Sequence, residues 1–485
     1  MKYLLTFFAL SIVFSSYAQL YEGFTLGKSK DEIGFDFIPN VNGSYTILSS
    51  SRTTFSGNEN YILSNLNSNK NYDWLNFDTT TPDKPYSIIK TSDGGFLISG
   101  TRRILGWEGN NTYLLKLDNQ FNIQWENHYG WTGREYGFNV IESKNGGFIV
   151  VGSNSSDELL EIGDFYILKT DLNGNIIWEN KFGHVDQKDF LFDLKEDNQG
   201  NIYTVGVKAG HYKYSTFDFK DTLSKASIIK FNSNGAIIWE KHFGETYNNS
   251  WYKEIEINEL GEIYALGSTQ ENSNGSFDIL LSKLDTNGNK IWDRNFGNNE
   301  FDYGNSMFID QSNIYIAGTS CTNSNNYSTD IKALKLDFNG SVIWEHNFGG
   351  NKSEYANKIK PTYNGLAIIG STKSYGNGGS ESYLIELSLS GDILYKGNTH
   401  KENSTITLYP NPANDYISVT LSNLDDCTKI PIEIFDSKGK LINHFQLDNQ
   451  NTKQIDLTKY SKGIYLLKYQ SNCTNEVFVS KFIVK

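Results

Sequence analysis

The stretch ILKTDLNGNIIWENKFG, residues 167–183, decides the fold, because the chain contains seven copies of it. Five copies are close, an early one at residues 65–78 is weaker, and a late one at residues 384–397 has tyrosine in place of tryptophan. The shared aromatic position is occupied by Trp74, Trp125, Trp178, Trp239, Trp292, Trp344 and Tyr395, at intervals of 51 to 61 residues. Self-similarity at such a period is the signature of a repeat architecture.

A second recurring phrase, represented by YSIIKTSDGGFLISG at residues 86–100, lies between these copies. Each repeat therefore contains four short strands, which are joined in pairs by tight turns such as residues 93–95 and 173–174. The glycine and asparagine of these turns adopt the positive φ that hairpins require. Ile, Val, Tyr and Phe alternate with polar residues, as in half-buried strands. Four antiparallel strands per repeat predict a seven-bladed β-propeller over residues 19–397.

We expect the tryptophan of each outermost strand to pack between neighbouring blades. The phrase Lys-x-Asp-x-Asn-Gly-x-x-x-Trp, residues 283–292, resembles the tryptophan-docking repeat of quinoprotein-like propellers and the repeats of secreted bacterial propellers. That resemblance is specific for the fold only. Residues 21–27 resemble the end of a repeat and could complete the last blade, whereas Tyr395 competes for the same place. The sequence does not decide which of these two segments completes the last blade.

The first 18 residues have the pattern of a secretory signal peptide. Lys2 gives a positive start, residues 3–14 are mostly apolar, and residues 16–18 form a small-x-small cleavage site. The apolar run is shorter than the about 20 residues that a membrane span needs. We therefore predict cleavage after Ala18 and export of the rest of the chain.

The C-terminal part has a different pattern. Residues 398–404 are polar and are expected to form a linker, and residues 405–485 contain short alternating strands. All nine tryptophans precede this part, which agrees with a separate fold. We predict a small Ig-like β-sandwich here, so the whole chain is expected to be all-β.

Residues 405–485 closely resemble the type A C-terminal sorting domain of the type IX secretion system. The residues that carry the resemblance are Tyr409, Pro410, Asn411, Pro412, Asp415, Asp436, Gly439, Lys440, Gly463, Tyr465 and the ending from Lys481 to Lys485. The resemblance implies export across the outer membrane of a Gram-negative bacterium and recognition of the tail by the secretion translocon. It also implies removal of the tail with attachment of the protein to surface polysaccharide.

Three cysteines occur in the chain, Cys321, Cys427 and Cys473. A secreted protein can form disulfides, and an odd number leaves one thiol outside any internal pair. Cys427 and Cys473 lie in the same C-terminal module and could pair, although neither belongs to the sorting pattern.

The sequence contains no strong catalytic, metal or nucleic-acid motif. It lacks a Gly-rich phosphate loop, a GxSxG elbow, an HExxH motif and any Cys/His cluster. The DTNGN run from Asp285 loosely resembles a calcium loop but lacks the bidentate glutamate, so we interpret it as a hairpin turn. No cofactor or metal is predicted, with calcium as a weak possibility. The formal charge of −13 argues against binding to nucleic acid.

The long, variable connections predict the binding face. In a four-stranded meander the second turn and the link to the next blade lie on the same face of the disc. Aromatic side chains beside Asn, Ser and Arg suit sugar rings or a protein partner. The candidate ligand-binding residues are Trp107, Trp131, Arg134, His211, Tyr212, Tyr247 and Tyr327. By contrast, Tyr136, Trp251 and Tyr303 begin innermost strands, and we expect them to pack.

Acidic residues recur just before the innermost strands: Glu32, Glu135, Asp189, Asp302 and Glu354. A closed ring could crowd them around the channel mouth, where crowded carboxylates have raised pKa values and act as a glycosidase acid or bind a cation. The alternative is structural, with each carboxylate bonded to neighbouring backbone N–H groups. Repetition argues against catalysis, because an active site is asymmetric.

Two functions remain open at this point. The first is a secreted or surface-anchored propeller that acts as a non-enzymatic binding or adhesion module for a glycan or a protein. The second is a propeller enzyme, glycoside-active or quinoprotein-like, with its site at the channel mouth.

Overall fold

A computed structural model describes most of the chain. The described residues are 23–27, 31–52, 59–68, 71–77, 83–103, 109–130, 133–155, 163–183, 189–208, 224–244, 248–274, 276–323, 328–376, 379–394, 405–409, 412–422, 430–436, 439–447, 452–470 and 477–484. The chain divides into two compact units, Met1–Thr399 and His400–Lys485, which are treated separately. The predicted signal peptide lies outside the described residues. Nowhere in the described ranges is there a helix long and apolar enough to cross a membrane.

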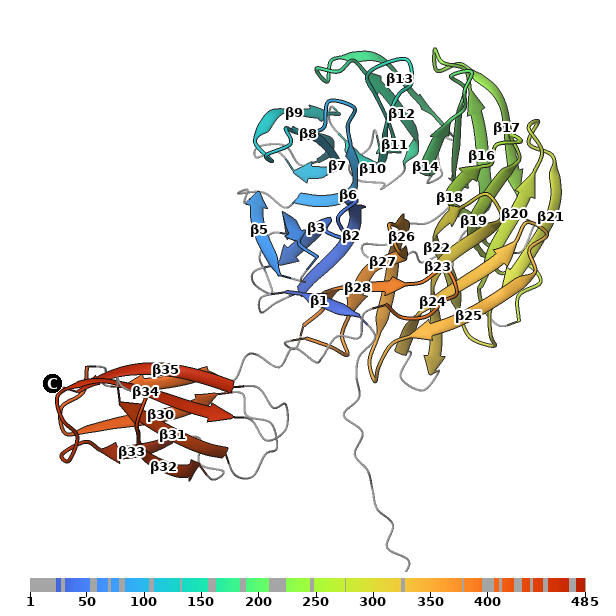
Figure 1. Ribbon diagram of the computed structural model, residues 1–485. Coiled ribbons are helices and arrows are strands. Elements are labelled where there is room, and N and C mark those ends of the chain that lie inside the picture. Colours follow the sequence, from blue (N-terminus) through green and yellow to red (C-terminus); the bar gives the residue numbers. More distant parts are fainter. Residues whose placement is uncertain are drawn as a thin grey trace, which may run out of the picture. The chain divides into compact units, whose positions relative to one another are not determined.

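The first unit is a seven-bladed β-propeller in which every blade is a four-stranded antiparallel sheet (Figure 1). The innermost strands are β2 (Asp31–Pro39), β6 (Asp83–Lys90), β10 (Arg134–Glu142), β14 (Phe190–Glu196), β18 (Ser250–Ile257), β22 (Asp302–Ile309) and β26 (Glu354–Thr362). The second strands are β3 (Tyr45–Arg52), β7 (Phe96–Arg103), β11 (Phe148–Ser155), β15 (Ile202–Lys208), β19 (Ile263–Thr269), β23 (Asn313–Asn323) and β27 (Gly365–Thr372).

The third strands are β4 (Glu59–Leu66), β8 (Asn110–Leu117), β12 (Asp164–Thr170), β16 (Lys225–Phe231), β20 (Asp278–Leu284), β24 (Ser328–Asp337) and β28 (Glu381–Leu387). The outermost strands are β5 (Tyr72–Phe77), β9 (Ile123–Tyr129), β13 (Ile176–Phe182), β17 (Ile237–Phe243), β21 (Lys290–Phe296), β25 (Val342–Phe348) and, in the last blade, β1 (Phe24–Leu26). The predicted fold is confirmed. We number the blades 1 to 7 from β2 to β26.

Both ends of the repeat region complete the last blade. β1 pairs antiparallel with β28, so that Phe24 lies opposite Leu384 and Leu26 opposite Ser382. Farther along the same edge, Ile393 forms a bridge with Leu387. The outer position is therefore shared by the first and the last described segments of the propeller, and the ring is closed by strand pairing rather than by one continuous repeat. Tyr395 itself lies outside the described residues.

Five of the recurring tryptophans pack against the outer turn of the following blade, as expected: Trp125, Trp178, Trp239, Trp292 and Trp344. The side chain of Trp74 lies outside the described residues. Gly174 lies in the outer hairpin turn of blade 3 with φ +80°, and a Cβ there would lie 3.0 Å from the Trp125 ring of blade 2. Gly235 and Trp178 repeat this arrangement at the next junction, with a separation of 2.9 Å. The Asn-Gly turn therefore serves two purposes: it accepts a positive φ, and it leaves room for the indole ring of the preceding blade.

The second unit is a β-sandwich. One sheet contains β29 (Thr405–Tyr409), β30 (Tyr416–Ser422) and β33 (Thr452–Asp456). The other contains β32 (Leu441–Leu447), β31 (Ile430–Asp436), β34 (Gly463–Gln470) and β35 (Val477–Val484). Ile417 and Val419 of the first sheet share a core with Ile434, Leu467 and Phe482 of the second. This is the predicted Ig-like module.

Candidate ligand site at the channel mouth

A β-bulge in every innermost strand builds the lining of the central channel. The pairing with the second strand shifts by one residue at the same position in all seven blades, for example between Gly34 and Asp36 and between Tyr252 and Glu254. Such a bulge sets two consecutive residues against one on the partner strand. As a result, consecutive side chains such as Phe35 and Asp36 both line the channel.

The first residue of each bulge forms what we call the mouth ring. It lies nearer the start of the innermost strand, where the link from the preceding blade enters. The mouth ring comprises Phe35, Tyr86, Phe138, Phe192, Lys253, Asn305 and Asn357, from blades 1 to 7 in that order. All seven line a cavity of about 270 Å³. The ring is aromatic over blades 1 to 4 and polar over blades 5 to 7.

Neighbouring rings of the aromatic arc of the mouth ring pack against one another, edge to face for Tyr86 and Phe138 and tilted for Phe138 and Phe192. The ring centroids of Tyr86 and Phe138 are 5.0 Å apart, and those of Phe138 and Phe192 are 5.4 Å apart. Two ammonium groups lie against this arc. Lys253 Nζ is 4.2 Å from the Phe192 centroid, and Lys84 Nζ is 5.6 Å from those of both Phe35 and Tyr86. These are cation–π distances, so the arc positions both lysines.

The second residue of each bulge forms what we call the floor ring: Asp36, Ser87, Asn139, Asp193, Glu254, Ser306 and Lys358. Lys358 Nζ lies 2.9 Å from Glu254 Oε1, and Lys360 Nζ lies 2.5 Å from Asp36 Oδ1. Asp193 accepts the backbone N–H of Ile255 at 2.9 Å and the side-chain amide of Asn139. Each carboxylate of the floor ring is therefore bonded to another residue of the channel.

The floor ring separates the mouth cavity from a second cavity of about 240 Å³. The two cavities share six of the seven floor residues, and the second is lined farther along the strands by Ile89, Ile141, Lys195, Glu256 and Lys360. Lys195 and Glu256 form an ion pair of 3.0 Å there. The mouth cavity therefore has aromatic and polar walls and a floor of bonded polar groups.

The environment of the channel shifts the pKa values of two neighbouring groups, Glu254 and Lys253, toward neutral pH. Burial raises the pKa of the Glu254 carboxyl to about 7, with Asp193 adding to the rise and Lys358 opposing it. Burial lowers the pKa of the Lys253 ammonium to about 8, and the positive charges of Lys358 and Lys84 lower it further. The mouth cavity consequently becomes more positive as the pH falls from 9 to 6.

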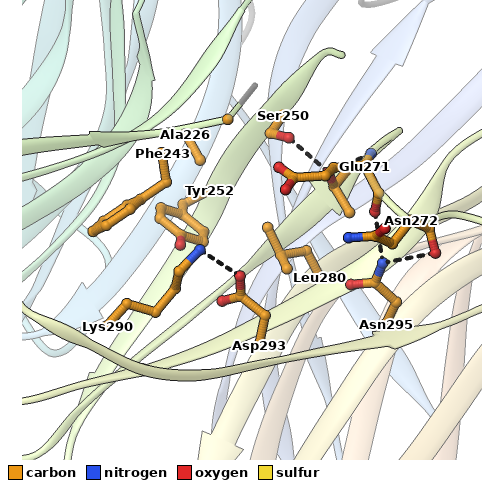
Figure 2. Close-up of a pocket in the computed structure, with 12 residues that line it drawn as sticks. Ala226, Phe243, Ser250, Tyr252, Glu271, Asn272, Leu280, Lys290, Asp293 and Asn295 are labelled. Atoms are coloured by element: carbon orange, nitrogen blue, oxygen red, sulfur yellow. Dashed lines mark hydrogen bonds and ion pairs between the residues drawn. The ribbon is translucent and has the colours of Figure 1, made fainter. Parts of the chain in front are cut away.

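A smaller hollow of about 40 Å³ lies away from the channel, between blades 4 and 5 (Figure 2). Lys290 forms an ion pair of 2.5 Å with Asp293. Tyr252 donates to Ser282 at 2.6 Å, and Ser282 donates to Asp293 at 2.7 Å. Because these polar groups are already bonded to one another and the hollow is small, the channel mouth is the better candidate.

The five recurring acids lie inside the blades rather than around the channel mouth. Glu32, Glu135, Asp189, Asp302 and Glu354 are all buried, and none is among the described residues that line the two channel cavities. Glu354 shows their role: it accepts the Gly350 N–H at 2.9 Å and the Thr372 hydroxyl at 2.7 Å. Such bonds tie the entering link to the second strand of the same blade.

Most of the predicted ligand-binding residues fall outside the described residues. These are Trp107, Trp131, His211, Tyr212, Tyr247 and Tyr327. Arg134 is described and begins β10. Arg134 is not among the residues that line the mouth cavity. Trp251, expected to pack, is buried against Phe277, with ring centroids 5.0 Å apart.

The turn that loosely resembles a calcium loop is a hydrogen-bonded hairpin turn. Asp285 Oδ1 accepts the N–H groups of Asn287 and Asn289 at 2.9 and 2.8 Å, and Oδ2 accepts the Asn289 amide. These bonds lower the pKa of Asp285. Across the described ranges, no group of three or more His, Cys, Asp or Glu side chains is placed to hold a metal ion.

The first and last blocks of the sorting pattern meet in the second unit. Ala413, next to Pro412, donates its N–H to the Ile483 carbonyl at 2.7 Å, and Gly439 occupies a turn with φ +81°. Tyr465 is buried, with its ring stacked on Phe482 at 5.4 Å. Pro412 and Asp415 are exposed, and Gly463 begins β34. The residues Pro410, Asn411, Lys485, Cys427 and Cys473 lie outside the described residues, as do the side chains of Tyr409 and Lys481.

The mouth and floor rings were not predicted from the sequence. Strict alternation along a strand places only one residue of each bulged pair toward the channel, so the pairs do not stand out. An alignment of the seven innermost strands does, however, reveal where the bulged pair lies. A small residue precedes the pair in several blades, as in Gly34, Gly137, Gly304 and Ala356, and the pair itself varies from Phe-Asp to Lys-Glu.

Comparison with known proteins supports the assignment of the second unit. Residues 407–485 match the family described as secretion system C-terminal sorting domain. This domain indicates type IX secretion of the chain to the cell surface or the medium, and it implies interaction with the secretion machinery. No curated protein sequence matches the chain significantly.

Several solved structures resemble the chain in fold. An ulvan lyase of polysaccharide lyase family PL25 has 11% identity and a TM-score of 0.46, over 77% of this chain and 96% of that one. PorZ, a surface component of the type IX secretion system of Porphyromonas gingivalis, has 11% identity and a TM-score of 0.34, over 93% and 69% of the two chains. The acylaminoacyl peptidase of Pyrococcus horikoshii has 10% identity and a TM-score of 0.43, over 81% and 58%. At such identities the likeness concerns the fold alone.

Proposed function

We propose that the propeller is a non-enzymatic binding module, displayed at the cell surface or released, that takes a glycan at the channel mouth. The observation that carries this proposal is the asymmetric mouth ring, with Phe35, Tyr86, Phe138 and Phe192 on one side and Lys253, Asn305 and Asn357 on the other. All blades share the bulge, but the mouth-ring residues, which a ligand would contact, vary among the blades.

The shape and chemistry of the mouth cavity favour a sugar ring. Its volume of about 270 Å³ is close to the lower end of the roughly 300–1,000 Å³ of small-molecule sites. Aromatic faces on one wall can pack against the C–H groups of a sugar, and amides on the other wall can bond to its hydroxyls. A protein ligand could insert only a side chain or a terminus into this space, so a glycan is the better fit.

Binding is favoured over catalysis by the state of the floor ring. A general acid or base must reach the reacting group with a proton to exchange. Asp36 is instead ion-paired with Lys360, and Asp193 accepts a backbone N–H. Glu254, whose pKa of about 7 would allow it to exchange a proton, is held by Lys358. For the enzyme alternative, turnover of a glycan would have to be lost in a Glu254→Gln variant.

The second unit supplies the route to the surface in this proposal. The type IX machinery recognises the sorting domain, removes it and attaches the propeller to surface polysaccharide. The bond between Ala413 and Ile483 supports recognition of a folded unit, because it joins the first and last blocks of the pattern.

A glycan array tests the binding function on the secreted chain. The array contains neutral and acidic glycans and is probed with and without calcium. The parent is compared with the double variant Phe35→Ala, Tyr86→Ala and with a control, Ile177→Ala, Ile238→Ala, whose aliphatic side chains are exposed on the outermost strands. We expect binding that is lost in the channel variant and kept in the control. Binding to no glycan, or equal binding by the channel variant, contradicts the proposal.

A further inference from the structure

We infer that the glycan unit at the channel mouth is anionic, carrying a uronate carboxylate or a sulfate ester that binds between Lys84 and Lys253 while its ring packs on the aromatic arc. This inference rests on the proposed function and names its ligand class. The two sources of the charge share one chemistry, an oxyanion on a sugar ring.

The position of the two lysines is the first argument. Lys84 lies in β6, Lys253 lies in β18, and both line the mouth cavity. Their ammonium groups rest against Phe35, Tyr86 and Phe192 at 4.2 to 5.6 Å from the ring centroids. An anion bound by these ammonium groups is therefore held beside the rings on which the sugar would stack. A flat apolar face next to a cation matches an acidic sugar better than a neutral one.

The balance of charge in the mouth cavity is the second argument. Its lining contains three carboxylates, Asp36, Asp193 and Glu254, and three ammonium groups, Lys84, Lys253 and Lys358. Lys360, which lines only the second cavity, forms an ion pair with Asp36. The mouth cavity with this neighbour therefore has one positive charge in excess, although the chain as a whole has a formal charge of −13.

The difference in charge between the mouth cavity and the rest of the protein predicts which anionic glycans the site prefers. Within about 10 Å, the screening length of 0.1 M salt, an anion in the cavity experiences mainly the charges that line it, which have one positive charge in excess. A long polyanion also meets the acidic remainder of the protein, which repels it. We therefore expect the site to prefer a single acidic unit, at a chain end or on a branch, over a continuous polyanion.

The opposite wall supplies groups for the sugar hydroxyls. The amide of Asn305 donates to the Ala356 carbonyl at 2.9 Å, and the amide of Asn357 donates to the Gly34 carbonyl at 2.7 Å. The Oδ1 atoms of both side chains can accept hydrogen bonds from sugar hydroxyl groups. The anion and the hydroxyls thus have separate partners on separate walls.

The protonation of Lys253 agrees with this geometry. Burial and the neighbouring ammonium groups of Lys358 and Lys84 lower its pKa to about 8, whereas the Glu254 and Asp193 carboxylates raise it. A bound anion adds a further negative charge beside the ammonium group, so binding favours the protonated lysine. Affinity is then expected to fall as the pH rises from 6 to 9, since Lys253 loses its proton and Glu254 becomes ionised.

A panel of matched oligosaccharides tests the inference on the secreted chain. Each uronate- or sulfate-bearing oligosaccharide is assayed beside its carboxyl-reduced or desulfated counterpart. The proteins are the parent, Lys84→Met, Lys253→Met and a control, Lys144→Met, whose exposed lysine lies in the turn after β10, at the far end of the strand from the mouth. Thermal unfolding verifies that the variants are folded.

We expect at least one acidic oligosaccharide to bind about tenfold or more tightly than its neutral counterpart. This preference disappears in Lys84→Met and Lys253→Met and persists in Lys144→Met. The inference is overturned if the neutral counterpart binds equally well or if the two channel variants keep the preference. In the first of these cases the proposed function survives, because the aromatic variant still abolishes binding. If no oligosaccharide binds at all, the proposed function fails together with the inference.

Discussion

Lys358 of β26 and Glu254 of β18 form an ion pair of 2.9 Å between blades 7 and 5. The pair extends across the intervening blade 6, where the equivalent residue is the small Ser306. Because Ser306 is small, the side chains of blades 5 and 7 can meet across the floor of the channel. The repeated residues form the blades, and the residues that differ between repeats form the candidate site.

Removal of one partner of this pair should destabilise the propeller. At pH 8, Lys358→Met leaves the buried Glu254 carboxylate without its ammonium partner, at a cost of about 3 kcal/mol. The double variant Lys358→Met, Glu254→Gln should recover most of the loss, because no uncompensated charge remains. Urea unfolding measures both. Equal stability of the parent and the single variant would contradict an ion pair at this position.

The raised pKa of Glu254 gives the stability a specific pH dependence. The pKa is about 7 in the folded chain, against an ordinary value of 4.5, so between these values only the folded state holds the proton. The resulting stability is complete below pH 4.5 and is lost as the pH rises through about 7. In Glu254→Gln, unfolding measurements at pH 5 and pH 7.5 should show a smaller decrease, by on the order of 1–3 kcal/mol. An unchanged slope would rule out this assignment.

The docking of the tryptophans can be separated from backbone strain with two glycines. Gly174 has φ +80° and faces the Trp125 ring, whereas Gly146 has φ +84° and a Cβ added there would meet no other atom within 4 Å. Gly146→Ala should cost about 1 kcal/mol from backbone strain alone. Gly174→Ala should cost about 2–3 kcal/mol, because the Asn127 amide, 2.2 Å from the added Cβ, and the Trp125 indole, 3.0 Å from it, must also move. Identical losses in thermal unfolding would show that these contacts with blade 2 do not constrain the turn.

The fold was predictable because its determinants are local and repeated. The 51-to-61-residue period, the Asn-Gly turns and the outer-strand tryptophans each recur in the sequence, so one repeat is enough to recognise a blade. The way in which the ring closes was harder to predict from the sequence. The segment at Phe24 and the one at Ile393 both contribute to the last blade, and only long-range pairing reveals this division.

The candidate site was less predictable than the fold, for a geometric reason. The bulge turns both Lys253 and Glu254 toward the channel, whereas the two-residue period of a regular strand turns neighbours to opposite faces. The recurring acids have a structural role within their blades: Glu135 accepts a hydrogen bond from Asn154 of the second strand, and Glu354 accepts one from Gly350 of the entering link. Residues that vary among the repeats, rather than those that recur, form the mouth cavity.

The closing strand and the sorting domain should differ in their effect on propeller stability. Removal of residues 19–27 takes away β1 and exposes the edge of β28, so the propeller should unfold at a lower temperature and aggregate. Removal of residues 400–485 deletes a separate compact unit and should leave propeller unfolding unchanged. Calorimetry of the two truncated chains measures this difference. A large effect of the second deletion would show that the units depend on each other.

Secretion should depend on the folded core of the sorting domain. Tyr465 stacks on Phe482 and donates to the Ser461 carbonyl at 2.9 Å, whereas its neighbour Ile464 is exposed. Tyr465→Ala should destabilise the unit by about 3 kcal/mol and leave the protein inside the cell. Ile464→Ala should be secreted normally. Immunodetection in cell and medium fractions distinguishes the two results, and normal secretion of Tyr465→Ala would contradict a requirement for the packed domain.

The most direct test of the channel-mouth site is lysine footprinting of the secreted chain. An amine-reactive reagent is applied at pH 8 in the presence and absence of the acidic oligosaccharides, and labelled lysines are located by mass spectrometry. The account predicts that ligand protects Lys84 and Lys253 while Lys144 and Lys440 react as before. Protection confined to lysines outside the channel, with Lys84 and Lys253 labelled equally in both conditions, would contradict it.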